Sequence, residues 1–425
     1  AIGNQTVNRI AMWDGDAWRP LTGPNGTGVS GDATTRVRAI LAHDDGSGPA
    51  VYVAGRFGGA GGVQAFGIAR WDGVAWSGLT GPSGNGFNDE VYALAVFDDG
   101  DGPKLYAGGA FTTAGGQPAN RVAKWDGSAW SPVGSGMNSR VEALAVFDDG
   151  DGASLYAGGA FIVAGGQSAN RIAKWNGSAW TALGSGLTTP NGNPLVTSLT
   201  VADDGNGPAL YVGGTFAFAG GIGVNKIARW NGIAWSSVRG DSDSGGGISG
   251  VSVQTLTPFN DGTGPALAVG GSFSSTVSGV PASRVALYNA ATGWRALEPG
   301  DAAPLNNTVF ALAATQGATN APSTLIIGGD FTASPVGNAR LVTWRGCFVP
   351  SDPCPADLTG PALDGIPNGT VDAFDLNYYI ALWLSDDPAA DLTGPALDGV
   401  PDGTVNAFDL NYYIDLWLNN QGACP

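Results

Sequence analysis

Short segments in which apolar and polar residues alternate recur along most of the chain. In one of them the apolar side chains Val91, Ala93, Ala95 and Phe97 occupy every second position, and the same pattern returns at 141–147. Alternation over so few residues is typical of a β-strand with one buried face. Asp-Gly or Asn-Gly pairs separate several of these segments, and such pairs favour tight hairpins. The pattern therefore predicts an all-β structure built from short strands.

A unit of roughly 50 to 58 residues repeats along the chain, and this is the size of one four-stranded propeller blade. Residues 91–130 and 141–180 are nearly identical. Each unit contains Trp-[Asp/Asn]-Gly and a second Trp five residues after the first. The motif begins at Trp13, Trp71, Trp125, Trp175 and Trp230; a weaker copy has Tyr288 and Trp294 in the two places, and Trp344 ends the series alone.

The unit at 91–133 predicts four strands, a to d. Strand a covers 91–97, and strand b is LYAGGAF at 105–111. A glycine-rich loop precedes strand c (NRVAKW, 120–125), and a tight Asp-Gly turn precedes strand d (SAWSPV, 128–133). We expect the Gly-Gly pair of strand b to let neighbouring backbones approach closely. We expect the two tryptophans to pack adjacent blades together, since each buries a large area.

These units resemble the kelch repeat, in which an apolar run ending in Gly-Gly is followed by a loop and then by an aromatic residue and a Trp across a hairpin. The closest match is LAVGGSF at 267–273 with RVALYNAATGW at 284–294, whereas the other units shorten the hairpin to W-D-G-x-A-W. The resemblance covers about 8–346 and implies a β-propeller domain at 1–346. It implies little about a ligand, because propellers host enzymes and binding proteins alike.

Six strands of type b predict a six-bladed propeller. Five units are complete, the last has strands a to c only, and 8–21 hold a detached c–d pair. Closing the ring would join N- and C-terminal strands in one blade, which leaves one c strand over, at 9–15 or at 339–345. This strand either closes its own ring or completes a blade of a neighbouring molecule, and the second route would build a filament. The b strands end at Phe57, Phe111, Phe161, Phe216, Phe273 and Phe331.

A different, duplicated segment follows a linker at 347–353. The sequence ADLTGPALDG[IV]P occurs twice in 354–425, each time followed by an acidic loop and by FDLNYYIxLWL, whose apolar residues fall at helical spacing. Each copy predicts a loop and a helix. Cys354 and Cys424 bracket this segment, which suits a disulfide and an oxidising compartment. Because Cys347 is also present, three disulfide pairings among the three cysteines are possible.

The segment at 354–425 resembles a dockerin, a duplicated EF-hand-like module, in the Cys-flanked variant found in planctomycete proteins. The resemblance implies calcium ligands with oxygen donors at alternating positions. GPALDG[IV]P is inserted among those positions, so Asp364 and Asp398 are candidate replacements for early ligands. Alternatively, Asp and Asn here only cap helices and form turns. The implied ligands are Asp357, Thr359, Asn368, Thr370, Asp372 and Asp375 in one copy, and Asp391, Thr393, Asp402, Thr404, Asn406 and Asp409 in the other.

Charge and composition narrow the classes of function. The net charge of −17 argues against nucleic acid, whose phosphates require Lys and Arg. The apolar runs are strand-length, which argues against a membrane span. We interpret the start at Ala1 as that of a processed secreted chain. A lone His43 argues against zinc and against a Ser-His-Asp triad. The acids of the a–b turns, such as Asp98 and Asp99, either bind calcium or shape the turns, and we favour the turns.

The sequence predicts a non-enzymatic extracellular protein, free or at the cell surface. Its propeller would bind a ligand or assemble, and its terminal module would dock through calcium to a protein partner of the cohesin type or to a second copy. The alternatives are a carbohydrate-binding propeller and a filament subunit. An enzyme with paired carboxylates is less favoured, because Glu90, Glu142 and Glu298 are the only glutamates. The site of such an enzyme would be sought near the longer segments at 187–194 and 240–251.

Overall fold

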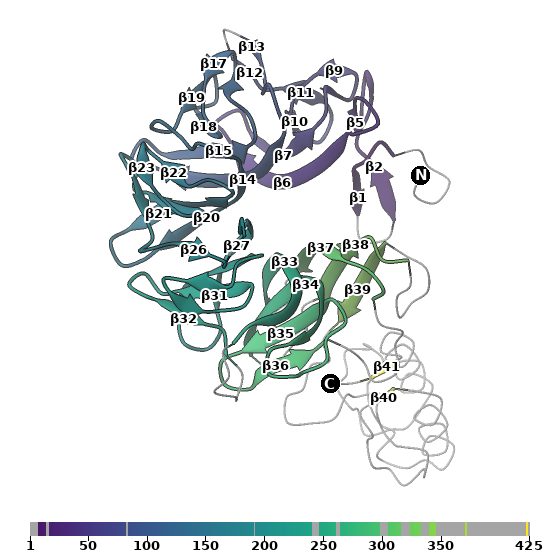
Figure 1. The fold of residues 1–425 in the computed structure, drawn as a ribbon. Coiled ribbons are helices and arrows are strands. Elements are labelled where there is room, and N and C mark those ends of the chain that lie inside the picture. The colour runs from purple at the N-terminus through teal and green to yellow at the C-terminus, as the bar shows by residue number, and fades with distance from the viewer. Residues whose placement is uncertain are drawn as a thin grey trace, which may run out of the picture. The chain divides into compact units, whose positions relative to one another are not determined.

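A computed structural model describes most of the chain up to residue 345 and divides it into two compact units. The first unit holds 1–202 and 208–256, and the second holds 203–207 and 257–425. Figure 1 shows the strands by label. The described residues are 7–13, 17–81, 84–190, 192–239, 246–260, 264–297, 305–315, 324–332, 340–345, 370–371 and 422–423.

The first unit contains four antiparallel sheets of four strands each (Figure 1), as the repeat predicts. We number them in chain order. Each sheet is a series of hairpin neighbours, a next to b, b next to c, and c next to d. The first sheet is β6 (Arg36–Asp44), β7 (Pro49–Arg56), β10 (Ile68–Trp71) and β11 (Trp76–Gly78); the second is β14 (Val91–Asp98), β15 (Pro103–Gly109), β18 (Val122–Trp125) and β19 (Trp130–Pro132); the third is β20 (Val141–Asp148), β21 (Ala153–Gly159), β24 (Ile172–Trp175) and β25 (Trp180–Ala182); the fourth is β27 (Val196–Asp203), β28 (Pro208–Gly214), β31 (Ile227–Trp230) and β32 (Trp235–Ser237).

The second unit contains most of a fifth four-stranded sheet and a sheet of three strands. The three-stranded sheet has strands a to c only, and the predicted c–d pair near the N-terminus forms a two-stranded sheet in the first unit. The division of strands among the sheets is thus confirmed, and the number of blades in a closed ring stays a prediction. The strands are β33 (Ile248–Asn260), β34 (Pro265–Thr276), β35 (Val285–Asn289) and β36 (Gly293–Ala296); β37 (Val309–Thr315), β38 (Thr324–Gly329) and β39 (Leu341–Arg345); β1 (Ala11–Trp13) and β2 (Trp18–Pro20).

The Gly-Gly pair of strand b serves two close approaches, as the sequence predicts. A side chain at Gly108 would lie 2.7 Å from Val141 of the next sheet, and one at Gly109 would lie 2.4 Å from the carbonyl oxygen of Glu90 in its own sheet. Real Cβ contacts are not this short, so only glycine allows both neighbours to pack at these distances.

Paired tryptophans join consecutive sheets of the first unit. Trp175 and Trp180 lie with ring centroids 5.4 Å apart, and both are buried. The indole of Trp180 donates a 3.0 Å hydrogen bond to the carbonyl of Val133 in the preceding sheet, and Trp235 does the same to Leu183. The predicted role of these residues in packing neighbouring sheets is therefore confirmed, with a polar contact that the sequence pattern does not reveal.

The glycine-rich loop between strands b and c differs from its prediction, because it forms a second small hairpin. In the second sheet this is β16 (Thr113–Ala114) with β17 (Gln117–Pro118). Strand c then begins at Val122 instead of 120, because Arg121 has a left-handed backbone with φ of 69°. The other short strands are β3 (Thr22–Gly23), β4 (Gly26–Thr27), β5 (Val29–Ser30), β8 (Gly59–Ala60), β9 (Val63–Gln64), β12 (Thr80–Gly81), β13 (Gly84–Asn85), β22 (Val163–Ala164), β23 (Gln167–Ser168), β26 (Leu187–Thr188), β29 (Phe218–Ala219) and β30 (Ile222–Gly223).

A backbone hydrogen bond ties the residues between the small hairpin and strand c to the segment before the next sheet. The N–H of Met137, which precedes β20, donates to the carbonyl of Asn120 in the second sheet. The neighbouring Gly136 has φ of 70°, and a Cβ there would lie 2.1 Å from that same carbonyl oxygen. The equivalent bond from Phe87 to Phe66 ties the second sheet to the first. The sheets are thus fixed to one another by backbone as well as by side chains.

The aspartate carboxylates of the a–b turns accept local hydrogen bonds. Asp98 accepts from the backbone N–H groups of Gly100 and Gly102, as an Asx turn requires. Asp99 accepts from the hydroxyl of Tyr106 and the ammonium of Lys124. Burial opposes the ionisation of Asp99, but these two bonds outweigh it and lower its pKa. The contacts agree with the preferred interpretation that these acids shape the turns.

The C-terminal segment is described at two short strands, β40 (Thr370–Val371) and β41 (Gly422–Ala423), which pair antiparallel. The predicted loop-and-helix copies, the linker and the proposed cysteine bridge lie outside the described residues. Among the residues that are described, no helix has the length and apolar character that a membrane crossing needs.

Candidate binding pocket between the first and second sheets

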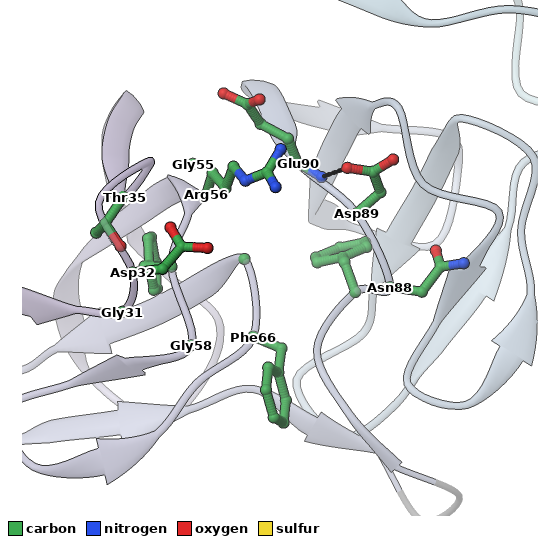
Figure 2. A pocket seen from close by; sticks show the side chains of 13 residues that line it. Gly31, Asp32, Thr35, Gly55, Arg56, Gly58, Phe66, Asn88, Asp89 and Glu90 are labelled. Atoms are coloured by element: carbon green, nitrogen blue, oxygen red, sulfur yellow. Dashed lines mark hydrogen bonds between the residues drawn. The ribbon is translucent and has the colours of Figure 1, made fainter.

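A pocket of about 300 Å³ opens between the first and second sheets (Figure 2). Four segments line it: 31–35 before β6, 55–58 at the end of β7, 66–67 before β10, and 87–90 before β14. Two of them immediately precede an a strand, and the other two flank the small hairpin between b and c. The topology of the repeat therefore brings these segments together, and their side chains decide what the pocket can hold.

Three pocket residues depart from the repeat. Before the Phe that ends strand b, the second and third sheets have Ala110 and Ala160, whereas the first has Arg56. Before strand c, the second sheet has Asn-Arg at 120–121, and the first has Phe-Gly at 66–67. Because the four-stranded frame is otherwise the same, the other sheets show what these positions do when they serve structure alone.

In the second sheet the Asn-Arg pair is occupied by structural bonds. The amide of Asn120 donates to the carbonyl of Ser135 at 3.2 Å, and the guanidinium of Arg121 donates to the carbonyls of Ala110 and Phe111. Asn170 and Arg171 repeat the arrangement in the third sheet. The arginine side chain thus folds back over the end of its own strand b.

The first sheet lacks these bonds, because the residues that replace Asn and Arg there cannot form them. Gly67 keeps the left-handed backbone, with φ of 73°, but has no side chain to cover strand b. Phe66 has no side-chain amide, and the residue is 39% exposed. Arg56 is exposed beside this space, and its guanidinium makes no hydrogen bond or ion pair to any described residue. The departures therefore open the pocket and leave a cation and an aromatic ring at it.

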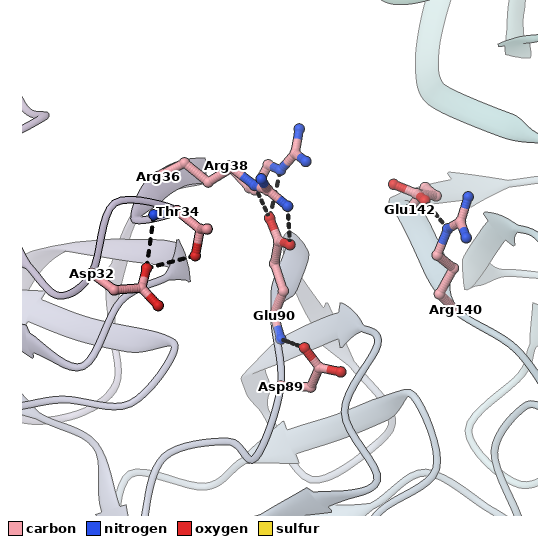
Figure 3. Close-up of polar contacts among 8 residues, drawn as sticks. All are labelled: Asp32, Thr34, Arg36, Arg38, Asp89, Glu90, Arg140 and Glu142. Carbon is pink, nitrogen blue, oxygen red and sulfur yellow. Dashed lines mark hydrogen bonds and ion pairs between the residues drawn. The ribbon is translucent and has the colours of Figure 1, made fainter.

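The segment before β6 is longer than its counterpart before β14 and supplies a carboxylate. Oδ1 of Asp32 accepts hydrogen bonds from the Thr34 backbone N–H (2.8 Å) and hydroxyl (2.6 Å), as Figure 3 shows. The bond from the Thr34 hydroxyl, followed by that from its N–H, lowers the pKa of Asp32. The second oxygen of Asp32 accepts no hydrogen bond from a described residue, and the carboxylate faces the pocket (Figure 2).

Glu90 forms the buried wall on the side of the second sheet. Its side chain is 2% exposed and accepts two bonds from Arg36, at 2.6 and 2.5 Å, and one from Arg38 at 2.8 Å (Figure 3). Burial raises the pKa of Glu90, but the two arginines outweigh it, so the pKa is lowered overall. These ion pairs bridge the first and second sheets, and Glu90 is fully engaged by them.

Two neighbours of Glu90, Asn88 and Asp89, differ in whether their side-chain oxygens have hydrogen-bond partners. Asn88 is occupied, because its side-chain oxygen accepts from the backbone N–H groups of Thr112 and Thr113. Asp89 accepts only from the N–H of Glu90, at 2.7 Å, which leaves its other oxygen without a partner among the described residues (Figure 2). The pocket thus offers Asp32 and Asp89 as acceptors and Arg56 as donor.

The corresponding position of the third sheet has no such arrangement. There Arg140 and Glu142 bond to each other within one sheet (Figure 3), and both arginine and glutamate are thereby paired. Bridging of two sheets by a buried carboxylate is seen in the first unit at Glu90, within the residues the structure describes.

The residues predicted as calcium ligands are not tested by the described structure. Of that set only Thr370 falls on described residues, in β40, where its backbone pairs with Ala423. Over the part of the chain that is described, no three His, Cys, Asp or Glu side chains gather as a metal site requires. The longer segments at 187–194 and 240–251, which the sequence singles out, do not line this pocket. The signal was present as three departures from the repeat, at Arg56, Phe66 and Gly67.

Repeated four-stranded antiparallel sheets, packed consecutively through Gly-Gly and tryptophan pairs, define the class of the protein as a β-propeller. Residues 75–296 match the Rax2 C-terminal beta propeller domain family, and the chain belongs to this family. No curated protein shows a significant sequence match to the chain.

Two solved structures show the range of similar proteins. An extracellular domain assigned to a hybrid two-component system of B. thetaiotaomicron is 16% identical, with 76% of this chain and 33% of that chain covered and a TM-score of 0.45. An ancestral GH74 enzyme is 15% identical, with 72% and 36% covered and a TM-score of 0.44. The chain spans about a third of the length of each of these two proteins.

Proposed function

We propose that this is a non-enzymatic extracellular binding protein that holds a ligand in the pocket between its first and second sheets. The observation that carries the proposal is the set of departures at Arg56, Phe66 and Gly67, which replace structural bonds with unoccupied groups around one cavity. Positions that break the local rules of a fold without a structural gain are expected at functional sites. A concave pocket with a few convergent polar groups is the usual form of a small-molecule site.

The C-terminal segment supports a second part of the proposal, docking. Residues 354–425 resemble a dockerin, and the acidic loops would hold calcium through Asp357, Asp375, Asp391 and Asp409 with their neighbours. A bound ion stabilises only the folded form that binds it. The module would join the propeller to a protein partner outside the cell, with the cysteines suiting an oxidising compartment.

The ligand pocket is tested by thermal melting of the full chain against sugars, polysaccharides, amino acids and nucleotides. We expect at least one compound to raise the melting temperature in proportion to its concentration, and Arg56→Ala to abolish the rise. Arg140→Ala removes an arginine from the third sheet and serves as the matched control. If no compound raises the melting temperature, or if Arg56→Ala leaves the rise unchanged, the pocket is not the binding site.

The docking module is tested by calcium analysis of the full chain with and without excess chelator. We expect elemental analysis to find calcium, and chelation to lower the melting temperature of one transition while leaving that of the propeller unchanged. Asp375→Asn with Asp409→Asn should reproduce the effect of the chelator. Absence of bound calcium, or an unchanged melting curve, removes the ion from the account.

Self-assembly by strand exchange is a second candidate, supported by the hairpin β1–β2. Its Trp13 is 51% exposed, whereas the equivalent Trp125 in the second sheet is 5% exposed. A strand with an open edge and an exposed Trp is a surface on which another strand can pair. We expect size measurement to show polymers of the full chain that vanish when residues 1–21 are deleted. A monomeric full chain, or polymers that survive the deletion, would exclude exchange of this hairpin.

A further inference from the structure

We infer that the ligand of this pocket is a neutral sugar ring, as part of an extracellular polysaccharide. The inference rests on the pocket named in the proposed function and adds the chemical class of its ligand. It follows from the donors and acceptors that the pocket leaves open, from its exposed ring and from its balance of charge.

The open polar groups are of both kinds. The guanidinium of Arg56 is a donor only, with its N–H groups in a planar fork, whereas the free oxygens of Asp32 and Asp89 are acceptors only. A sugar hydroxyl both donates and accepts, so adjacent hydroxyls can satisfy a carboxylate and a guanidinium at once. Figure 2 shows Arg56 between Asp32 on one side and Asp89 and Glu90 on the other. Arg56 and Asp32 therefore face a common space, and Asp89 lines its far side.

A buried hydroxyl adds an independent sign of a polar ligand. Thr35 is 8% exposed, and its Oγ1 is buried without a hydrogen-bond partner. Thr35 lines the pocket together with Asp32. A buried polar atom without a partner is costly, so such an atom at a pocket wall points to a group that is supplied by the ligand or by ordered water.

The exposed ring of Phe66 supplies an apolar surface at the same pocket. Its counterpart in the second sheet is Asn120, so the frame of the repeat does not need an aromatic residue at this position. The C–H face of a sugar ring is apolar while its edge is polar, and it can pack on Phe66 while its hydroxyls meet Arg56 and Asp32. The volume of about 300 Å³ lies at the small end of the range for small-molecule sites, which fits one ring or two.

Charge favours a neutral ligand over a polyanion. The charge of Arg56 helps to lower the pKa of Asp32, Asp89 also lines the pocket, and Glu90 is compensated by Arg36 and Arg38, so the pocket presents both signs of charge. The whole chain carries −17, which repels polyanions at long range. An acidic sugar would meet two carboxylates, and an organic cation would meet the free guanidinium. A neutral polyol encounters neither conflict.

The experiment is affinity electrophoresis of the full chain in gels that contain either neutral polysaccharides (β-glucan, mannan, galactan, xyloglucan) or acidic ones (polygalacturonate, alginate). We expect at least one neutral polysaccharide to retard the chain, and a salt increase from 50 to 500 mM to leave the affinity unchanged, since no counterions are released. Arg56→Ala, Asp32→Asn and Phe66→Ala should each weaken the affinity by about ten- to a hundredfold. All three are at the surface of the pocket, and Arg140→Ala should have no effect.

The outcomes separate the inference from the proposed function. Binding of acidic polysaccharide alone, or of an amino acid in the melting panel, with sensitivity to Arg56→Ala, overturns the neutral sugar and leaves the pocket as the site. Neutral binding that is insensitive to all three substitutions places the sugar elsewhere and overturns the inference as well. Failure of every compound in both experiments overturns the proposed function itself. Melting curves of each variant show that it is folded.

Discussion

The junction of the first and second sheets and the junction of the second and third sheets are built from the same parts but end in different chemistry. Both have a buried Trp in strand d, Trp130 or Trp180, and both have a glycine before the next sheet, Gly86 or Gly136. At the second junction the side chains of Asn120 and Arg121 donate hydrogen bonds to backbone carbonyls. At the first junction the equivalent positions are Phe66 and Gly67, and Arg56 stands free beside them.

The comparison separates structure from function within one chain. Parts shared by both junctions are those that packing requires, so their removal should cost stability equally at either place. The side chains of Arg56 and Phe66, which are special to the first junction, contribute no hydrogen bond or ion pair to the fold among the described residues. They should therefore matter to binding and little to stability, which is the usual relation between functional sites and their scaffold.

The largest effect is expected from the shared tryptophans. Trp130→Ala and Trp180→Ala should each reduce the free energy of unfolding by about 3–5 kcal/mol, because each leaves a large cavity between sheets. The Trp180→Ala substitution should cost about 1 kcal/mol more than Trp130→Ala, since the indole of Trp180 also donates a hydrogen bond to the carbonyl of Val133. Chemical denaturation of both variants measures this. A cost at Trp130 far below that at Trp180 would break the claim that the junctions share their packing.

The next effect concerns the glycines that precede each sheet. Gly86→Ala and Gly136→Ala each place a Cβ 2.1 Å from a carbonyl oxygen, with φ of 64° and 70°. We expect a loss of roughly 2–4 kcal/mol from strain and displacement together. Gly166→Ala has φ of 80° but open space around it, and it should cost about 1–2 kcal/mol. Equal melting temperatures for Gly136→Ala and Gly166→Ala would show that the close approach is not tight.

A smaller effect is expected at Glu90, which sharpens the difference between the junctions. Its carboxylate is buried while its arginine partners are 45% and 42% exposed, so Glu90→Gln should cost about 1–2 kcal/mol, less than for a fully buried pair. Glu142→Gln, in the third sheet where Arg140 takes the place of Glu90, breaks a bond within one sheet and should cost less than about 0.5 kcal/mol. The reverse order in denaturation would contradict the bridging role of Glu90.

The last effect comes from Asp45 and depends on pH, because its contribution to stability is present at neutral pH and disappears in acid. Burial opposes its ionisation, but hydrogen bonds from Ser47 and Trp125, together with the nearby hydroxyl of Tyr52, lower its pKa to about 2. A pKa below that of the unfolded chain gives stability that is fully present above about pH 4. This stability is lost as the pH falls through about 2. Asp45→Asn should therefore flatten the decline of the melting temperature between pH 4 and pH 2, and an unchanged slope would contradict the shift.

The frame of the protein was predictable from the sequence because its determinants are local and repeated. Alternation, Gly-Gly pairs, Asp-Gly turns and paired tryptophans each act within one unit or between neighbours, so their spacing alone predicts four strands per sheet. The short hairpins between b and c were not predicted, because they depend on bonds to residues distant in sequence, such as that from the N–H of Gly165 to the carbonyl of Gly136.

The pocket was not predicted because its parts are far apart in sequence and come from three kinds of segment. The prediction rested on the longest segments, at 187–194 and 240–251, and not on the single-residue departures at Arg56, Phe66 and Gly67. Only the pairing of β6 with β7 and the packing against 87–90 bring these residues around one space. A comparison of each unit with the others, position by position, would have identified the departures.

The most direct test of the central claim is to restore the repeat at the first junction with Arg56→Ala, Phe66→Asn and Gly67→Arg together, and to measure melting temperature and polysaccharide affinity on the same sample. A Cβ at Gly67 meets nothing closer than 3.4 Å, and Arg121 has nearly the same backbone angle, so the arginine has room. The account predicts a melting temperature equal to or above that of the natural chain, with affinity for the best neutral polysaccharide lowered at least about a hundredfold. A restored variant that binds as before, or that melts well below the natural chain, would contradict it.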